Sequence, residues 1–327
     1  MKWLLVVFLL LGQSACISTK YIPVQPSEPA TAYLAQADQS NISKYAPVFL
    51  VDESDLLYNR IGTPSVINTE SDELSIYIDP GKPSIYVQER DFQTANASYK
   101  NYIYRIHFQE VPFSLFPFYL SSGRNVGLIV VVTVDEKSNP VLITTVHTCG
   151  CYLSFVPTSF LHEESFPDGW NFKKQKVFGE NLPGLLDLNG PLHTASNFKI
   201  VILLRAGTHR VKWIKTEHLE NIEKEYQILY APMIPVEKLK FLGQDDKTTS
   251  FFETSGSRRG HVKGSYKPFE KIFMSWWAMD LYVGEDKDFG PGEDTGTIFY
   301  TSLKFWDRKK SDMWNFNDFL SYWGWKL

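Results

Sequence analysis

The residues best suited to chemistry lie between His147 and Cys151, where the sequence reads His-Thr-Cys-Gly-Cys. Imidazole and thiolate are ligands that zinc and copper ions favour. If a strand continues through the segment, residues two apart project from one face, so His147, Cys149 and Cys151 would present three donors together. A fourth ligand would come from elsewhere, with His209 as first choice because it follows a turn after a strand, and His162 as second. The pattern predicts a Zn or Cu site.

A disulfide is an equally good interpretation of Cys149 and Cys151. Residues two apart in an extended strand lie about 6.6 Å apart at Cα, near the upper end of the range for a bridge. A bridge would therefore need a kink, which Gly150 is able to supply. A disulfide that closes such a small ring would stabilise the fold little, and the bond itself would be reactive. Both properties suit a thiol–disulfide redox protein. Inert buried thiols are the third alternative, because free cysteine often behaves as a small apolar residue.

The elements that would position this segment are mainly strands. Apolar runs on either side of the turn residues 135–140 predict a hairpin over 125–145, with central strands buried on both faces. A second strand pair is expected over 198–204 and 210–215, a short helix over 217–226 and a longer one over 268–280. The predicted fold class is α+β, mainly β, with an antiparallel sheet core and helices appended toward the C-terminus.

The first residues of the chain indicate export. Lys2 precedes an apolar run from Trp3 to Leu11, which is too short to span a bilayer. The small residues Ser14 and Ala15 stand directly before Cys16, and this segment resembles the lipobox of bacterial lipoproteins. The resemblance implies that residues 1–15 are a signal peptide and that Cys16 receives fatty acyl chains such as palmitate. Ordinary secretory cleavage near Cys16, without lipid, is the alternative.

The resemblance also implies a location in the cell envelope. Ile17 is not the acidic residue that favours retention in the inner membrane, so the outer membrane, facing the periplasm, is expected. Residues 17–44 are rich in Ser, Pro, Ala and Gln, which predicts a flexible tether after the lipidated cysteine. Residues 45–327 are expected to form a single globular domain, with no later segment able to span a membrane.

Composition limits the possible functions. The chain has 327 residues, 43% apolar and 21% charged, which is ordinary for a globular protein. Its net charge of -4 gives no electrostatic reason to expect nucleic acid as a partner. The sequence contains no G-x-S-x-G elbow, P-loop, H-E-x-x-H or G-x-G-x-x-G motif, so no catalytic set is assigned. A non-enzymatic role is therefore expected.

Three further segments are interpreted as structural. The acidic stretch 284–294 fails the EF-hand spacing and is expected to be a solvated turn, and the basic stretch 257–264 a solvated loop. In the helix over 268–280 the aromatic and aliphatic residues follow helical spacing, which predicts a stripe facing the core. The terminal Tyr322-Trp323-Gly324-Trp325 is expected to cover the sheet or to meet a partner.

These observations leave three hypotheses for function. The first is a membrane-anchored envelope lipoprotein that binds Zn, Cu or a partner at His147, Cys149, Cys151 and His209. The second is a thiol–disulfide redox protein that uses Cys149 and Cys151. The third is an assembly or structural lipoprotein with incidental cysteines. In each, the bilayer is a partner through acylated Cys16, and a second envelope protein is a possible partner.

Overall fold

The computed structural model describes residues 25–71, 73–188, 198–244 and 246–327. The expected signal peptide and Cys16 lie outside the described residues. The strands are β1 (Thr31–Ala35), β2 (Val48–Val51), β3 (Thr63–Asn68), β4 (Leu74–Asp79), β5 (Ile85–Gln93), β6 (Ser98–Val111), β7 (Gly123–Val134), β8 (Pro140–His147), β9 (Ser154–Pro157), β10 (Lys174–Val177), β11 (Glu180–Pro183), β12 (Phe198–Leu204), β13 (Val211–His218), β14 (Gln227–Ala231), β15 (Met233–Pro235), β16 (Leu242–Gln244) and β17 (Lys247–Thr249). The α-helices are α2 (Asn41–Lys44), α3 (Leu219–Glu225), α4 (Pro268–Ala278), α5 (Gly292–Thr295) and α6 (Phe316–Tyr322), and five short 3-10 helices accompany them: η1 (Leu57–Asn59), η2 (Glu163–Ser165), η3 (Val236–Lys240), η4 (Gly256–Arg258) and η5 (Phe305–Asp307).

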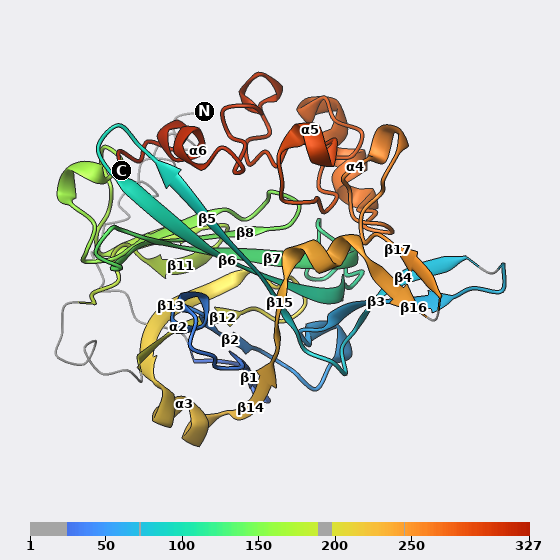
Figure 1. Cartoon of the computed structure of the whole chain (residues 1–327), viewed down its shortest axis with the longest axis horizontal. Helices are drawn as coiled ribbons and strands as arrows, with labels where there is room; N and C mark the ends of the chain where they lie inside the picture. The colour runs from blue at the N-terminus through green and yellow to red at the C-terminus, as the bar shows by residue number, and fades with distance from the viewer. Residues whose placement is uncertain (1–24, 72, 189–197, 245) are drawn as a thin grey trace, which may run out of the picture.

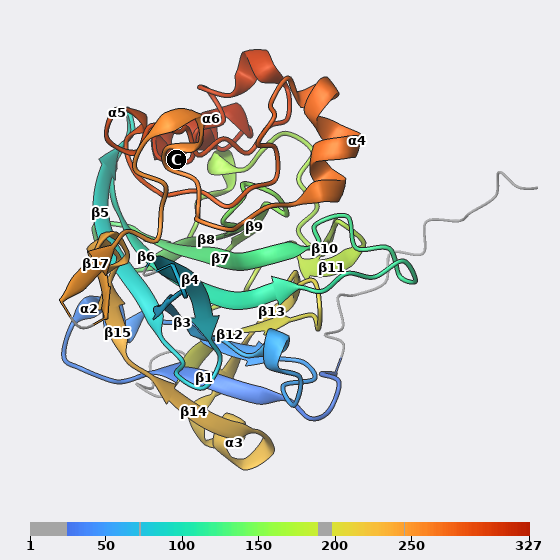
Figure 2. The same cartoon turned by 90° about the vertical axis from the view of Figure 1, so that its right-hand side faces the viewer.

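Two large sheets form the body (Figures 1 and 2). One has five strands in the order β13-β12-β2-β1-β14, and the other has six in the order β15-β5-β6-β7-β8-β9. Most neighbours are antiparallel, but β1–β14, β2–β12 and β5–β15 are parallel pairs. The three small sheets β3–β4, β10–β11 and β16–β17 are antiparallel hairpins. The predicted fold class, α+β and mainly β, is confirmed.

The predicted central hairpin is the pair β7 and β8, two interior strands of the six-stranded sheet. The carboxylate of Asp135 closes its turn by accepting hydrogen bonds from the backbone N–H of Lys137 at 2.9 Å and of Asn139 at 2.7 Å. Both strands are buried almost throughout because each face of this sheet is covered. The predicted strand pair β12–β13 and the helices α3 and α4 are also present.

The layers explain why the hairpin is apolar on both faces. Between the sheets, side chains of β1, β2 and β12 pack against those of β6 and β7. The second face of the six-stranded sheet is covered by the C-terminal segment from Phe289 to Leu327, including Met313 and Trp325. The second face of the five-stranded sheet is covered by α3 through Ile222. Figure 1 shows this order, with the C-terminal segment at the top and α3 at the bottom.

Part of the segment expected to be a flexible tether forms regular structure instead. Within residues 17–44, β1 lies between β2 and β14 in the five-stranded sheet, and Ala32, Tyr33 and Leu34 are buried. The strand has only five residues, and so short an apolar pattern is not sufficient to predict a strand within a Ser- and Pro-rich segment. Residues 31–35 therefore belong to the folded body and not to a flexible tether.

Helix α4 has the predicted span but the opposite orientation. Its buried positions are Glu270 and Ala278, with Met274 half-buried between them, so the inward face follows the spacing i, i+4, i+8. The expected core stripe is instead exposed, and the prediction that it faces the core is wrong. No helix in the described parts of the chain is long and apolar enough to cross a membrane.

Candidate functional site

The two cysteines lie in a tight turn at the end of β8. The strand ends at His147 instead of continuing, because Gly150 adopts a positive φ of 91°. The backbone N–H of Gly150 donates to the carbonyl of His147 at 2.8 Å, and that of His147 donates to the carbonyl of Cys151 at 2.9 Å. Glycine is required here, since a Cβ would lie 2.1 Å from the carbonyl oxygen of Tyr300. The assumption of a continuous strand face is therefore wrong.

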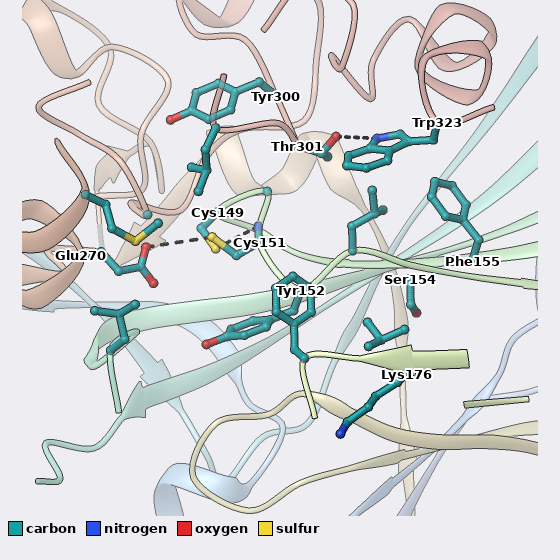
Figure 3. A pocket seen from close by; sticks show the side chains of 18 of the residues that line it. Cys149, Cys151, Tyr152, Ser154, Phe155, Lys176, Glu270, Tyr300, Thr301 and Trp323 are labelled. Carbon is teal, nitrogen blue, oxygen red and sulfur yellow. Dashed lines mark hydrogen bonds between the residues drawn. The ribbon is translucent and has the colours of Figure 1, made fainter. Parts of the chain in front are cut away.

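The turn brings the cysteines together. The backbone N–H of Cys151 donates to the sulfur of Cys149 at 3.3 Å, and both thiols are free. Cys149 is buried and Cys151 is half-buried, and both line the same pocket (Figure 3). Gly150 thus supplies the kink that a short bridge between the two residues requires.

The predicted histidine ligands make other contacts. Nε2 of His147 lies 3.1 Å from the carbonyl oxygen of His209, whose own Nε2 lies 3.0 Å from the carbonyl of Tyr58. His162 is exposed and precedes η2. Within the described ranges, no group of three or more His, Cys, Asp or Glu side chains is arranged to hold a metal ion. Cys149 and Cys151 are the predicted ligands that the structure gathers at one pocket.

A buried ion pair lies beneath the cysteines. Nζ of Lys267 is 2.9 Å from Oδ2 of Asp286, and both side chains are 1% exposed. Thr148, directly before Cys149, donates its hydroxyl to the same Asp286 carboxylate. Lys287 donates from Nζ to the carbonyl of Cys149 at 2.9 Å. Hydrogen bonds to Asp286 and Lys287 therefore hold the turn that carries the thiols in place.

These charges overturn two expectations of solvated surface. Glu285, Asp286, Lys287 and Asp288 are buried, so the stretch 284–294 is no solvated turn. Each has a partner elsewhere in the fold, as the pair between Glu285 and Arg258 at 2.7 Å illustrates. Arg258 belongs to the stretch 257–264, so this ion pair attaches that stretch to the body. The expectation that it is a solvated loop is therefore wrong. The lysine among the acidic residues at 285–288 was the sequence feature that could have predicted buried ion pairs here.

Glu270 adds an unusual carboxyl group. It is buried in the first turn of α4, and the sulfur of Cys151 lies 4.0 Å from its Oε2. Gly284 leaves room for this carboxyl, because a Cβ there would overlap Oε2. Burial raises the pKa of Glu270, and the nearby charge of Lys267 opposes that rise only in part. A carboxyl group with a raised pKa is a better proton acceptor than an ordinary one.

The two thiols titrate as a pair. Burial alone would raise the pKa of Cys149, but the hydrogen bond from the thiol of Cys151 and the charge of Lys267 outweigh it and lower that pKa. The hydrogen bond to Cys149 and burial raise the pKa of Cys151 well above its ordinary value. The pair therefore loses its first proton at a lower pH, and its second at a higher pH, than ordinary cysteines.

The pocket above the thiols has a volume of about 600 Å³ and mostly apolar walls. Figure 3 shows Tyr152, Phe155, Tyr300 and Trp323 around it, with the cysteines and Glu270 at one side. The apolar lining includes Leu120, Tyr152, Leu153, Phe155, Val177, Phe178, Met274, Tyr300, Leu303 and Trp323. Trp323 donates from Nε1 to the hydroxyl of Thr301 at 3.1 Å. In the terminal aromatic cluster, Trp325 covers the six-stranded sheet, one of the two expected roles, whereas Trp323 lines this pocket.

Comparison of the chain with protein-family models, with curated proteins and with solved structures gave no match in any of the three. Two neighbouring thiols, beside a buried lysine and a proton-accepting carboxyl in an apolar pocket, are suited to thiol–disulfide exchange.

Proposed function

We propose that the chain is a lipid-anchored protein of the bacterial cell envelope, and that Cys149 and Cys151 exchange thiol and disulfide states with a partner that enters the pocket. The observation that carries the exchange is the turn at Gly150, which directs both thiols into one pocket. The proposal favours exchange over a Zn or Cu site because the histidines at 147 and 209 bond to backbone carbonyls instead of joining the thiols.

In the proposed exchange, the partner carries a disulfide. The thiolate of the pair attacks one partner sulfur, the partner's S–S bond breaks, and the departing sulfur takes up a proton. The remaining thiol then gives up its proton, with Glu270 positioned to accept it, and attacks the mixed disulfide. A Cys149–Cys151 bond forms and the second partner thiol leaves. Two electrons pass from the pair to the partner, which ends as two thiols, and the reverse sequence oxidises a dithiol partner.

The microenvironment supports this chemistry in two respects. A lowered pKa at Cys149 provides thiolate, which is the reactive form. Cys151 is the more exposed of the two residues, so the pair is open to a partner on that side of the pocket. An exported location also suits the chemistry, because thiols there are exposed to oxidants.

The exchange is tested by equilibrating the purified chain with mixtures of reduced and oxidised glutathione. The pair should interconvert reversibly, and the oxidised form should have an intact mass about 2 Da below that of the reduced form, since bridging removes two hydrogens. Cys149→Ser and Cys151→Ser should each abolish the interconversion. Cys16→Ser, which leaves the pocket untouched, is the matched control and should retain it.

Two other results would overturn the exchange. Near-stoichiometric Zn or Cu, with thiols that resist alkylation until a chelator is added, would establish the metal site instead. Thiols that remain reduced at every glutathione ratio, in a metal-free protein, would leave the cysteines a structural role and favour the assembly hypothesis.

Anchoring has a separate test. Cys16→Ser should release the protein from the membrane fraction and abolish incorporation of labelled fatty acid. If the variant still fractionates with membranes and takes up label, the proposal of a lipidated Cys16 is wrong, whatever the behaviour of the dithiol.

A further inference from the structure

A group of exposed apolar side chains combines α4 with a loop from a distant part of the sequence. The aromatic patch, as we name it, comprises Phe113, Leu115, Phe116 and Phe118 of the β6–β7 loop and Ile272, Phe273, Trp276, Trp277 and Met279 of α4 and its C-cap, all of them exposed. Phe116 is 96% exposed and Trp276 is 73% exposed. Helix α4 projects from the right-hand side of the body in Figure 2. Isolated exposed apolar residues are ordinary, but a group of this size marks an interaction surface.

The two parts of the aromatic patch contact each other. The ring of Phe269, at the start of α4, lies 5.5 Å from that of Phe113 and 5.2 Å from that of Phe118. Phe118 also approaches Phe273, with ring centroids 6.3 Å apart. These contacts join a loop and a helix, more than 140 positions apart in the sequence, into one surface.

The charges around the aromatic patch suit an anionic surface. Residues 111–123 contain no charged side chain, and the one acidic residue of α4, Glu270, is buried in the dithiol pocket. Lys271 is exposed on the helix. The flanking charges Glu110 and Arg124 lie within 4.0 Å of each other and form a pair. The patch therefore presents aromatic rings and a cation, with no unpaired carboxylate within these two segments.

The start of the described chain lies beside the aromatic patch. Ser27 lines the same groove as Pro117 and Phe118. Nine residue steps separate Cys16 from Gln25, so even full extension would carry the chain only about 30 Å. An acyl chain on Cys16 would consequently keep this side of the body close to a bilayer. This step rests on the proposed lipidation.

We infer that the aromatic patch is a membrane-docking surface, which inserts its aromatic side chains into the interface of a bilayer containing anionic phospholipid. Tryptophan and phenylalanine favour the region between head groups and acyl chains, and a nearby lysine adds attraction to anionic lipid. The opposite face of α4 supplies Glu270 and Met274 to the dithiol pocket. Docking would thus hold that pocket at the membrane surface, where it meets partners that are themselves membrane-bound.

The test uses vesicles and the full chain carrying Cys16→Ser, exported and purified, so that no acyl chain contributes. This protein should co-sediment with vesicles of phosphatidylglycerol and phosphatidylethanolamine, and bind less to vesicles of phosphatidylcholine alone. Trp276→Ser together with Trp277→Ser should weaken binding at least ~10-fold, because burying one large apolar side chain contributes more than the free energy that a factor of ten requires. Both tryptophans are mostly exposed, so the variant should unfold at the same denaturant concentration as its parent.

Tyr230→Ser is the matched control, since Tyr230 is 55% exposed on β14, at the far end of the molecule from α4 in Figures 1 and 2. It should bind vesicles like the parent. Failure of the parent to bind any vesicle would overturn the inference. So would a lipid-independent dimer that the paired tryptophan substitutions abolish, because the patch would then be an interface between copies. Vesicle binding without fatty-acid labelling of the native chain would leave docking intact and reject only the lipidation.

Discussion

Replacing Lys267 with methionine should affect both the stability of the protein and its thiols. The substitution leaves Asp286 charged and buried, because its partner at 2.9 Å is removed while both positions are 1% exposed. At an effective dielectric constant of about 20, two charges at this distance attract by about 6 kcal/mol. Measured losses on removing one partner of a buried pair are about 3–5 kcal/mol, which is the expected decrease in the free energy of unfolding.

The thiols should respond in a defined direction. Lys267 lowers the pKa of Cys149, so its removal should raise the pH at which the pair loses its first proton. The rate of alkylation at neutral pH should therefore fall, and the pH profile of that rate should move upward. Chemical denaturation and pH-dependent alkylation measure the two effects on the same sample.

Two further variants separate charge from general damage. Lys267→Met with Asp286→Asn removes both charges and keeps an acceptor for the hydroxyl of Thr148, so most of the lost stability should return. Lys212→Met breaks another buried pair, with Asp52 at 2.8 Å, and should destabilise the protein without moving the thiol profile. A Lys267→Met protein as stable as its parent, or a thiol profile that shifts equally in Lys212→Met, would refute this account of the site.

Two other predictions follow from backbone geometry and from buried imidazoles. Gly150→Ala should destabilise the protein by more than Gly179→Ala. Both glycines have φ near +90°, but only at Gly150 would the added Cβ meet another atom, the carbonyl oxygen of Tyr300 at 2.1 Å. Equal denaturation midpoints for the two variants would contradict this. Burial lowers the pKa of His209 to about 3 and of His261 to about 4, so below pH ~6.5 the unfolded imidazoles bind protons that the folded ones do not. Each imidazole should therefore lower the free energy of unfolding by about 2 kcal/mol as the pH falls to ~5, whereas Glu285, whose pKa burial raises to about 7, acts in the opposite direction. The contribution of His209 is measured against His209→Gln, whose free energy of unfolding should fall by about 2 kcal/mol less between pH ~7 and ~5, and an equal fall in both proteins would exclude it.

Local signals in the sequence were sufficient for the strands. The turn at Asp135 to Asn139 is closed by hydrogen bonds within the turn itself, so the hairpin of β7 and β8 could be predicted from its own residues. The same holds for β12 and β13, which are adjacent in sequence and in the sheet. Where neighbours in sequence are also neighbours in space, the pattern determined the structure.

The site depended on partners that no local pattern reveals. Asp286 and Lys287 read as solvated charges, and only the fold brings them to Lys267 and to the carbonyl of Cys149. The end of β8 at His147 was missed for a related reason. The glycine that ends it is required by Tyr300, which lies 150 positions later in the chain.

The orientation of α4 follows from the same ion pair. Periodicity identifies an apolar face on a helix, but the choice of which face turns inward is made by everything the helix packs against. Here Lys267 precedes the helix and pairs with Asp286, Glu270 fills the space left by Gly284, and the carbonyl of Ala278 accepts a hydrogen bond from Arg308. Rotating the helix to bury its tryptophans would leave Asp286 charged and unpaired in the interior, at a cost of about 3–5 kcal/mol, which offsets what one or two buried apolar side chains return. The helix therefore keeps its polar face inward, and the charges that set the thiol pKa are also the reason that the aromatic patch faces outward.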